Sequence, residues 1–314
     1  MQYVGLQQQI SRNNRNSLFL LITFPALLLG MLYVITWAIV TFSEKDEYYS
    51  GTMDTNQAFL SGMPFILVAV GIWFLVAWFG HTSFIRMATG SKPLERKENK
   101  RVYNLVENLC IQLGIQTPHI YVIEDDSLNA FASGINKKTY AISLSRGIIN
   151  KLDDEELEGV IAHELTHIQN RDVRLLIISI IFVGIFAFLA EMAFRSLRFS
   201  GGKKKNGGAI ILIIIAVTAI CYLISIFLRF GISRSREYLA DAGAAEMTKK
   251  PYALANALRK IDADPNIEAV KSHDVAQLFI DNPQAEGPKK FSISGMFATH
   301  PPINKRIELL EQFV

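Results

Sequence analysis

The chain has 314 residues, half of them hydrophobic, and a mean hydropathy of +0.23, which is high for a soluble protein. Its net charge of +3 is too small to indicate a nucleic-acid partner, so we expect none. The two cysteines, Cys110 and Cys221, do not form a disulfide framework and are typical of a protein from a reducing compartment.

Four apolar segments account for the high hydropathy and predict an integral membrane protein. They are residues 17–43, 55–85, 175–190 and 209–228. A helix needs about 20 residues to cross the roughly 30 Å hydrocarbon core, so the first, second and fourth are long enough. The third is marginal, because Arg174 precedes it and Glu191 follows it. The first is too long for a signal peptide and no small-residue cleavage site follows, so we interpret it as an uncleaved anchor.

The charges around the first two segments predict the orientation of the chain. Arg12 and Arg15 precede the first segment without any acid, whereas the loop at residues 44–54 holds four acids and one lysine. Basic residues follow the second segment from Arg86 onward. Because cytoplasmic loops are enriched in lysine and arginine, we expect the N-terminus and the chain from Arg86 in the cytoplasm.

The cytoplasmic part is predicted to begin with a helix and a small β-sheet. Residues 100–113 show helical apolar spacing. Three strand-like stretches follow, at residues 118–123, 129–134 and 139–144. A strand edge beside a catalytic metal can hold an extended peptide by main-chain hydrogen bonds. Our candidate for that edge is Asn129, Ala130, Phe131 and Ala132, and the alternative is an ordinary buried hairpin.

The next helix carries the pattern His-Glu-x-x-His. Asp153 and Glu156 form a predicted capping box at its start. On a helix, His163 and His167 share one face, so both rings can bind one zinc ion. Glu164 lies beside that face, where it can take a proton from zinc-bound water. The alternative is a chance match on an amphipathic helix.

The predicted metal helix leads directly into the third apolar segment. It continues through residues 170–172, so His167 lies six residues, or about 9 Å of helix, before Val173. We therefore expect the zinc close to the membrane surface. Asn170 and Val173 stand where the extended metzincin pattern needs a glycine and a third histidine, which excludes that class.

A third ligand is expected after the fourth apolar segment. Glu237 and Asp241 share a helical face, so Glu237 can bind zinc while Asp241 accepts the outer N–H of a ligand histidine. The alternative is a solvated charged surface, but a hydrophobic hairpin that returns the chain to the same membrane face favours the ligand. His300 is a candidate for a transition-state or outer-shell histidine, or it is simply a loop histidine.

Four motifs in combination resemble the HtpX-like membrane zinc proteases of bacteria, distant relatives of the CAAX prenyl endopeptidases. They are Asn129–Ala132, His163–His167, Ser233–Asp241 and Thr299–Pro302. The resemblance implies a mainly α fold with a small β-sheet, in which four apolar helices join a cytoplasmic zincin-type metalloprotease domain. It also implies one Zn²⁺ held by His163, His167 and Glu237, Glu164 as general base, Asp241 behind the ligands, and His300 near the substrate carbonyl.

The family's function is the cleavage of misfolded or damaged membrane proteins in quality control or stress response. The resemblance therefore implies a multi-pass protein of the bacterial inner membrane with its active site on the cytoplasmic face. Its expected partners are membrane-protein or unfolded polypeptide substrates and the lipid bilayer.

We divide the chain into two membrane parts and two protease parts. Residues 1–85 and 173–230 are expected to form an N-terminal helix pair and a hydrophobic hairpin, and residues 86–172 and 231–314 the protease domain. One feature conflicts: the hairpin loop at 195–205 carries five basic residues and no acid. Either both segments span and the loop is translocated, or the hairpin dips in without crossing. We favour two spans, since irregular backbone at membrane depth is costly.

Three other functions are weighed against an endopeptidase. A membrane adaptor or pseudoprotease with a structural zinc has no need of Glu164, which is present. A prenyl-protein endopeptidase is expected to need more spanning helices than four apolar segments provide. A site-2-type intramembrane protease is disfavoured by the charged residues that flank the motif, such as Glu158 and Arg171.

Overall fold

The computed structural model describes residues 6–42, 54–199, 207–230, 234–263, 280 and 301–313. These residues form two compact units. The helical unit comprises Asn16–Phe79 and Ile178–Arg229, and the sheet unit comprises Met1–Arg15, Gly80–Ile177 and Phe230–Val314. Helices α1, α2, α6 and α7 contribute to the helical unit, and the sheet unit holds the β-strands and the remaining helices.

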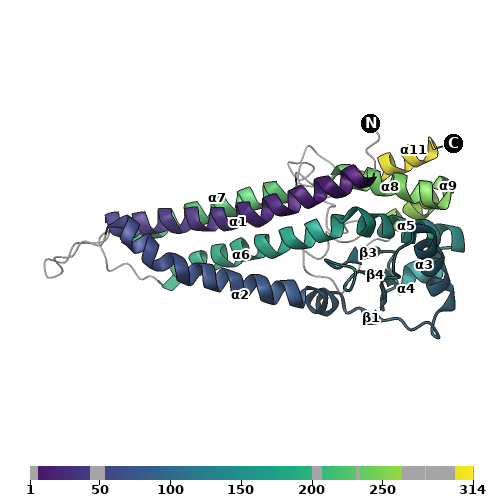
Figure 1. The fold of residues 1–314 in the computed structure, drawn as a ribbon, viewed down its shortest axis with the longest axis horizontal. Helices are drawn as coiled ribbons and strands as arrows, with labels where there is room; N and C mark the ends of the chain where they lie inside the picture. Colours follow the sequence, from purple (N-terminus) through teal and green to yellow (C-terminus); the bar gives the residue numbers. More distant parts are fainter. Residues whose placement is uncertain are drawn as a thin grey trace. The chain divides into compact units, whose positions relative to one another are not determined.

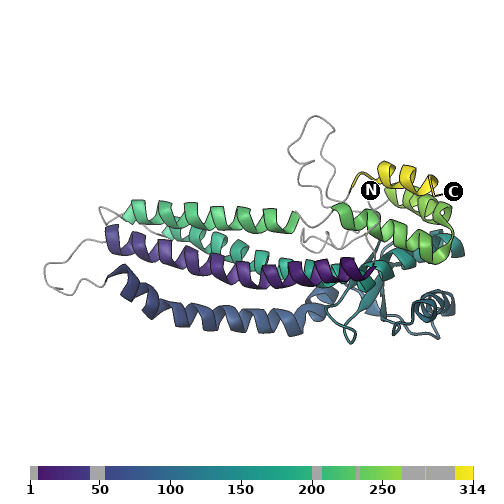
Figure 2. The ribbon, with the colours of Figure 1, turned by 45° about the horizontal axis from the view of Figure 1, so that its top comes forward.

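The helical unit is built from long apolar helices that run along one another (Figures 1 and 2). They are α1 (Leu6–Phe42), α2 (Thr55–Thr89), α6 (Asp172–Phe199) and α7 (Gly207–Phe230). Phe182 of α6 stacks on Phe24 of α1, with ring centroids 4.6 Å apart, and on Phe74 of α2 at 5.6 Å. Large apolar side chains such as Phe65 and Phe79 point outward, as expected for helices that face lipid.

Among the described residues, three helices are long and apolar enough to cross a membrane: Ile10–Phe42, Thr55–Thr89 and Asp172–Arg195. A fourth apolar helix, Ala209–Ser225, is shorter. The helix of the third segment is longer than its apolar stretch, because it includes charged residues on both sides. At its far end Arg195 pairs with Glu191, one turn away. A count of four spans therefore stays a prediction.

The predicted small sheet is confirmed, and it is mixed. Its strands are β1 (Lys92–Pro93), β2 (His119–Ile123), β3 (Ala130–Ser133) and β4 (Ala141–Ser145), in the order β1-β2-β4-β3. β2 and β4 are parallel, while β3 pairs antiparallel with β4 and therefore forms one edge. The two-residue strand β1 was not predicted, because it is too short to show an alternating pattern.

Helix α5 (Asp154–Asn170) lies at the centre of the sheet unit. Its capping box is present: Glu156 N–H donates to Asp153, and Glu156 in turn accepts from the Asp153 N–H. The helices around it are α3 (Lys100–Leu113), α4 (Arg146–Lys151), α8 (Arg234–Thr248), α9 (Pro251–Ala263) and α11 (Ile303–Glu311). α5 packs on α8, α9 and α3 and on strand β3, and α11 packs on α9 and α8 (Figure 1).

A glycine allows α8 to approach α5 closely. A Cβ atom on Gly243 of α8 would lie 2.6 Å from Cγ2 of Thr166, well inside van der Waals contact. Thr166 is on α5 between the two histidines of the motif. The close approach therefore brings the first turn of α8, with Glu237, toward the histidine face of α5.

The predicted continuous helix from the motif into the third apolar segment is wrong. α5 ends at Asn170, Arg171 adopts a left-handed conformation with φ 62°, and α6 begins at Asp172. The Arg171 N–H caps the carbonyls of His167 and Ile168, so the break is a regular helix end. The sequence hid it because no glycine marks the left-handed position.

Candidate metal centre

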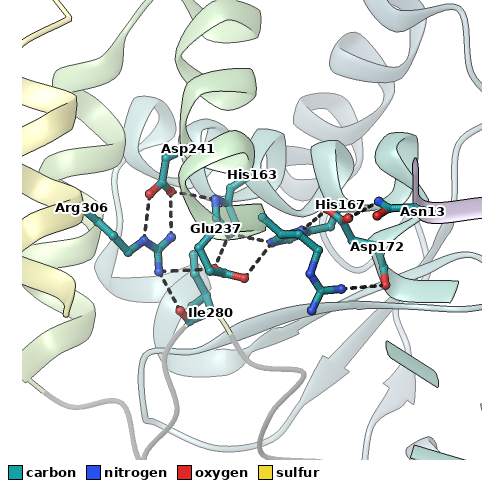
Figure 3. Close-up of polar contacts among 9 residues, drawn as sticks. Asn13, His163, His167, Asp172, Glu237, Asp241, Ile280 and Arg306 are labelled. Carbon is teal, nitrogen blue, oxygen red and sulfur yellow. Dashed lines mark hydrogen bonds and ion pairs between the residues drawn. The ribbon is translucent and has the colours of Figure 1, made fainter. Parts of the chain in front are cut away.

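Three potential metal donors converge between α5 and α8. The Nε2 atoms of His163 and His167 lie 3.1 Å apart. Glu237 places Oε1 3.5 Å from His167 Nε2 and Oε2 3.7 Å from His163 Nε2 (Figure 3). The three donors lie within 4.8 Å of one another, and two of these side chains are buried.

The outer nitrogen of each histidine faces a carboxylate. His163 Nδ1 lies 3.0 Å from Asp241 Oδ1, and His167 Nδ1 lies 3.0 Å from Asp172 Oδ2. A carboxylate at Nδ1 keeps the ring proton there, so each Nε2 presents a lone pair. Two lone pairs and a carboxylate oxygen at these distances repel one another unless a cation lies among them. The donor set therefore fits a metal ion.

Arg306 of α11 holds the carboxylate behind His163. The guanidinium, 1% exposed, donates bidentately to Asp241, with Nε–Oδ2 2.9 Å and Nη2–Oδ1 2.8 Å. Its Nη1 donates to the Ile280 carbonyl at 3.0 Å and lies 3.7 Å from Glu237 Oε2. Burial alone would raise the pKa of Asp241, but Arg306 and His163 outweigh burial and lower it. Asp241 is therefore held ionised.

The carboxylate behind His167 is held from the opposite end of the chain. Asn13, near the start of α1, donates Nδ2 to Asp172 Oδ1 at 2.6 Å and to the Asn170 carbonyl at 2.9 Å. Arg236 of α8 donates to the Asp172 carbonyl at 3.3 Å. Asp172 is 3% exposed, and its carboxylate is contacted by the Asn13 amide on one oxygen and by His167 on the other.

Glu164 is buried beside the donors. Burial raises the pKa of its carboxyl group, and the two histidines and a hydrogen bond with the Ala132 backbone only partly offset burial. His163 shows the opposite balance. Burial alone would lower its pKa, but the neighbouring carboxylates of Asp241 and Glu237 raise it, so the site favours a positive charge at this ring, as a proton or as a metal ion. Burial thus gives Glu164 a tendency to accept a proton.

The predicted substrate strand lies next to this acid. β3 is an edge strand in the sheet order, yet Asn129, Ala130, Phe131 and Ala132 are all buried. The Ala130 carbonyl accepts the Ile280 N–H at 2.9 Å, and the Ala130 N–H donates to Asn129 Oδ1 at 2.9 Å. The strand edge is thus covered by Ile280 and by α5. His300 lies outside the described residues.

Sequence reasoning missed Arg306 and Asn13, and it treated Asp172 only as a flanking charge. Asp172 had a usable signal, since it is an acid five residues after the second histidine. Asn13 had none, and Arg306 had only the nearby Thr299–Pro302 motif, which does not indicate that this arginine pairs with Asp241.

Comparison with known proteins identifies the family. The model of Peptidase family M48 matches residues 96–314. The chain belongs to this family. It is 58% identical to a protein named "Protease HtpX homolog" from Bacteroides fragilis (strain YCH46), with all of both chains covered. It is 34% identical to the protein of that name from Listeria monocytogenes serovar 1/2a, covering 98% of this chain and 99% of that one.

A solved structure also shows similarity. The crystal structure of Ste24p from S. mikatae matches with a TM-score of 0.44 and 19% identity, over 95% of this chain and 66% of that one. The family and the apolar helices make the chain a membrane metalloprotease, and the resemblance stated from the motifs is confirmed. As an M48 peptidase it uses a metal cofactor, for which the converging donors are the candidate site.

Proposed function

We propose that this M48 peptidase is a zinc endopeptidase with His163, His167 and Glu237 as its ligands. The observation that carries the proposal is the 3.1 Å approach of two Nε2 atoms whose Nδ1 atoms each face a carboxylate. Two histidines and one glutamate with a free fourth position are a ligand set typical of catalytic zinc. Bound there, zinc would supply a Lewis acid for the scissile carbonyl and lower the pKa of the attacking water.

The chain's own residues supply the proton transfers and the positioning. Glu164 accepts the proton of the attacking water and delivers it to the leaving amine, a role suited to a carboxyl group whose pKa is raised by burial. Asp241 and Asp172 hold the histidine tautomers. We assign His300 to the developing oxyanion and the β3 edge, Asn129–Ala132, to an extended substrate. The position of Ala132 beside Glu164 supports the latter assignment, and the substrate would have to displace the Ile280 N–H from the Ala130 carbonyl to pair with that edge.

We further propose that four helices span the bacterial inner membrane and that the active site faces the cytoplasm. The proposed parts are residues 1–85 and 173–230 in the membrane, and residues 86–172 and 231–314 in the protease domain. The substrates are misfolded or damaged membrane proteins and unfolded polypeptides, cleaved in quality control or stress response. Relatives named as proteases and the three candidate spans support this proposal.

Replacing the proposed base tests the chemistry. Glu164→Gln keeps the size of the side chain and every ligand, so the purified full-length variant should retain its zinc, measured by mass spectrometry of the metal. Cleavage of an unfolded membrane protein should fall by at least about a hundredfold. A zinc-free wild type would refute the metal assignment, and an active variant would refute the base.

The same assay separates the competing functions. An adaptor with a structural zinc would bind the unfolded protein but leave it intact with or without a chelator. A prenyl-protein endopeptidase would cleave a prenylated C-terminal peptide and ignore its unmodified counterpart.

A further inference from the structure

A second concave site in the sheet unit contains none of the candidate metal donors. The cavity has a volume of about 410 Å³, within the usual range of small-ligand sites. Three regions distant in sequence form its walls: the first turns of α1, the turn between β3 and β4, and the junction of α5 with α6. The loop that follows α3 closes it.

The charged residues that line the cavity are all basic. They are Lys137, Arg171 and Arg174, and no acid is among the described lining residues. Arg171 donates Nη1 to Asn14 Oδ1 at 2.9 Å. The Nε of Arg174 is buried and has no hydrogen-bond partner in the described part of the chain. A buried cationic N–H group without an acceptor is costly, so this wall favours an anion.

Tyr140 shows that the positive charges converge on the cavity. Burial raises the pKa of its phenol, and the charges of Arg171 and Arg174 oppose that rise. Both guanidinium groups therefore lie close enough to act on one half-buried side chain of the lining.

The rest of the lining combines the amide side chains of Gln116, Asn136 and Gln169 with apolar residues, and the cavity lies where the chain changes from polar to apolar. Four isoleucines line it, Ile10, Ile115, Ile135 and Ile168. Two candidate spans begin beside it, one at Ile10 and the other at Asp172, between the two lining arginines. The lining arginines thus lie at the start of a candidate span, where the headgroups of a membrane are expected.

We propose that this cavity binds the phosphate headgroup of an anionic phospholipid. The planar guanidinium of Arg174 matches two phosphate oxygens, and Lys137 and Arg171 add charge from the other walls. The isoleucines contact the glycerol and the first methylenes of the acyl chains. Basic pockets beside spanning helices are a recurrent form of headgroup site. This inference does not depend on the catalytic assignment.

The test measures bound lipid rather than proteolysis. Full-length protein in a phosphate-free neutral detergent is titrated with phosphatidylglycerol or phosphatidylcholine, and retained lipid is counted by native mass spectrometry. We expect preferential retention of phosphatidylglycerol, weakened about tenfold or more by Arg174→Gln and measurably by Lys137→Gln. Lys138→Gln is the matched control, because Lys138 is exposed on the same turn but does not line the cavity.

Several results would overturn the proposal. Equal retention of both lipids would contradict it. Equal weakening of phosphatidylglycerol retention by Lys138→Gln and Lys137→Gln would mean that diffuse surface charge attracts the lipid. Inorganic phosphate that binds in an Arg174-dependent way while phosphatidylglycerol is not retained would mean a free-phosphate site. Thermal unfolding is measured for each variant to check that it is folded. If Arg174→Gln does not fold, Lys137→Gln on its exposed turn decides between the outcomes.

Discussion

Each candidate ligand histidine faces a carboxylate at its outer nitrogen, but the two carboxylates are held differently. Asp241 is fixed by two hydrogen bonds from a buried guanidinium, that of Arg306. Asp172 is fixed by a neutral amide, that of Asn13. The guanidinium carries a full positive charge, whereas the amide carries none. The orientation of His163 therefore depends on an ion pair behind it, and that of His167 on a hydrogen bond from a neutral amide.

Removing either carboxylate should weaken the metal site without abolishing it. We expect Asp172→Ala and Asp241→Ala each to raise the dissociation constant of zinc by about 10–100-fold, as for other partners of ligand histidines. Glu237→Ala should be as severe as His163→Ala. The measurement is a competition titration with a chromophoric chelator. Asp262→Ala, on an exposed position of α9, is the control. Unchanged affinity in Asp172→Ala would contradict its assignment.

Arg306 should matter for stability as well as for the metal. Arg306→Met leaves the buried carboxylate of Asp241 without its ionic partner, so we expect a loss of about 3–5 kcal/mol in the free energy of unfolding. The control is Arg259→Met on α9, whose exposed guanidinium pairs with Glu311 and should contribute about 1 kcal/mol or less. Denaturant unfolding in detergent measures both, and equal losses would refute the distinction.

At the scale of elements, the close packing of α8 on α5 sets the distance between Glu237 and the histidines. Gly243 leaves room for the side chain of Thr166. Thr166 also donates its hydroxyl to the Ala162 carbonyl within α5, so its side chain has a fixed position. A larger residue at 243 must therefore displace α8 rather than Thr166.

The variant Gly243→Ala tests this contact. We expect it to cost about 1–3 kcal/mol of stability and to weaken zinc binding, because the new methyl group overlaps Thr166. Adding Thr166→Ala removes the overlapping atoms and should restore most of the zinc affinity. A double variant as weak as Gly243→Ala alone would show that the methyl group acts through another contact.

Local patterns predicted much of these elements, and their failures have physical causes. The capping box of Asp153 and Glu156 and the strands that flank residues 135–138 follow from neighbouring residues, so the sequence contains the information. At the helix break Arg171 bonds to the distant Asn14, and no local residue such as a glycine indicates the break. The same holds for Arg306 and Asn13, whose partners lie far away in the sequence.

At the scale of the whole molecule, the open question is how often the chain crosses the membrane. Three candidate spans are present in the described residues, and the fourth apolar helix is shorter. The loop between α6 and α7 is basic, which opposes its translocation. Both ends of that hairpin nevertheless lead to residues of one candidate metal centre, His167 and Glu237, so we expect both ends on the same side.

Labelling from outside the cell resolves the path. We expect a single cysteine at Asn206, which lies outside the described residues, to react with a membrane-impermeant thiol reagent in intact spheroplasts of a variant lacking Cys110 and Cys221. A cysteine at Lys138, which we place in the cytoplasm, is the control and should react only after the membrane is opened. Reaction at 206 only in opened membranes would mean that the hairpin does not cross.

The residues that support the two histidines also fix the time at which the site is completed. Asn13 reaches the ribosome exit before any other residue of the site, and Arg306 after all of them. A nascent chain that already exposes His163 and Glu164 still lacks the guanidinium that orients Asp241. The site is thus completed only after α11 has been synthesised, so a chain halted during membrane insertion lacks the contact that orients Asp241.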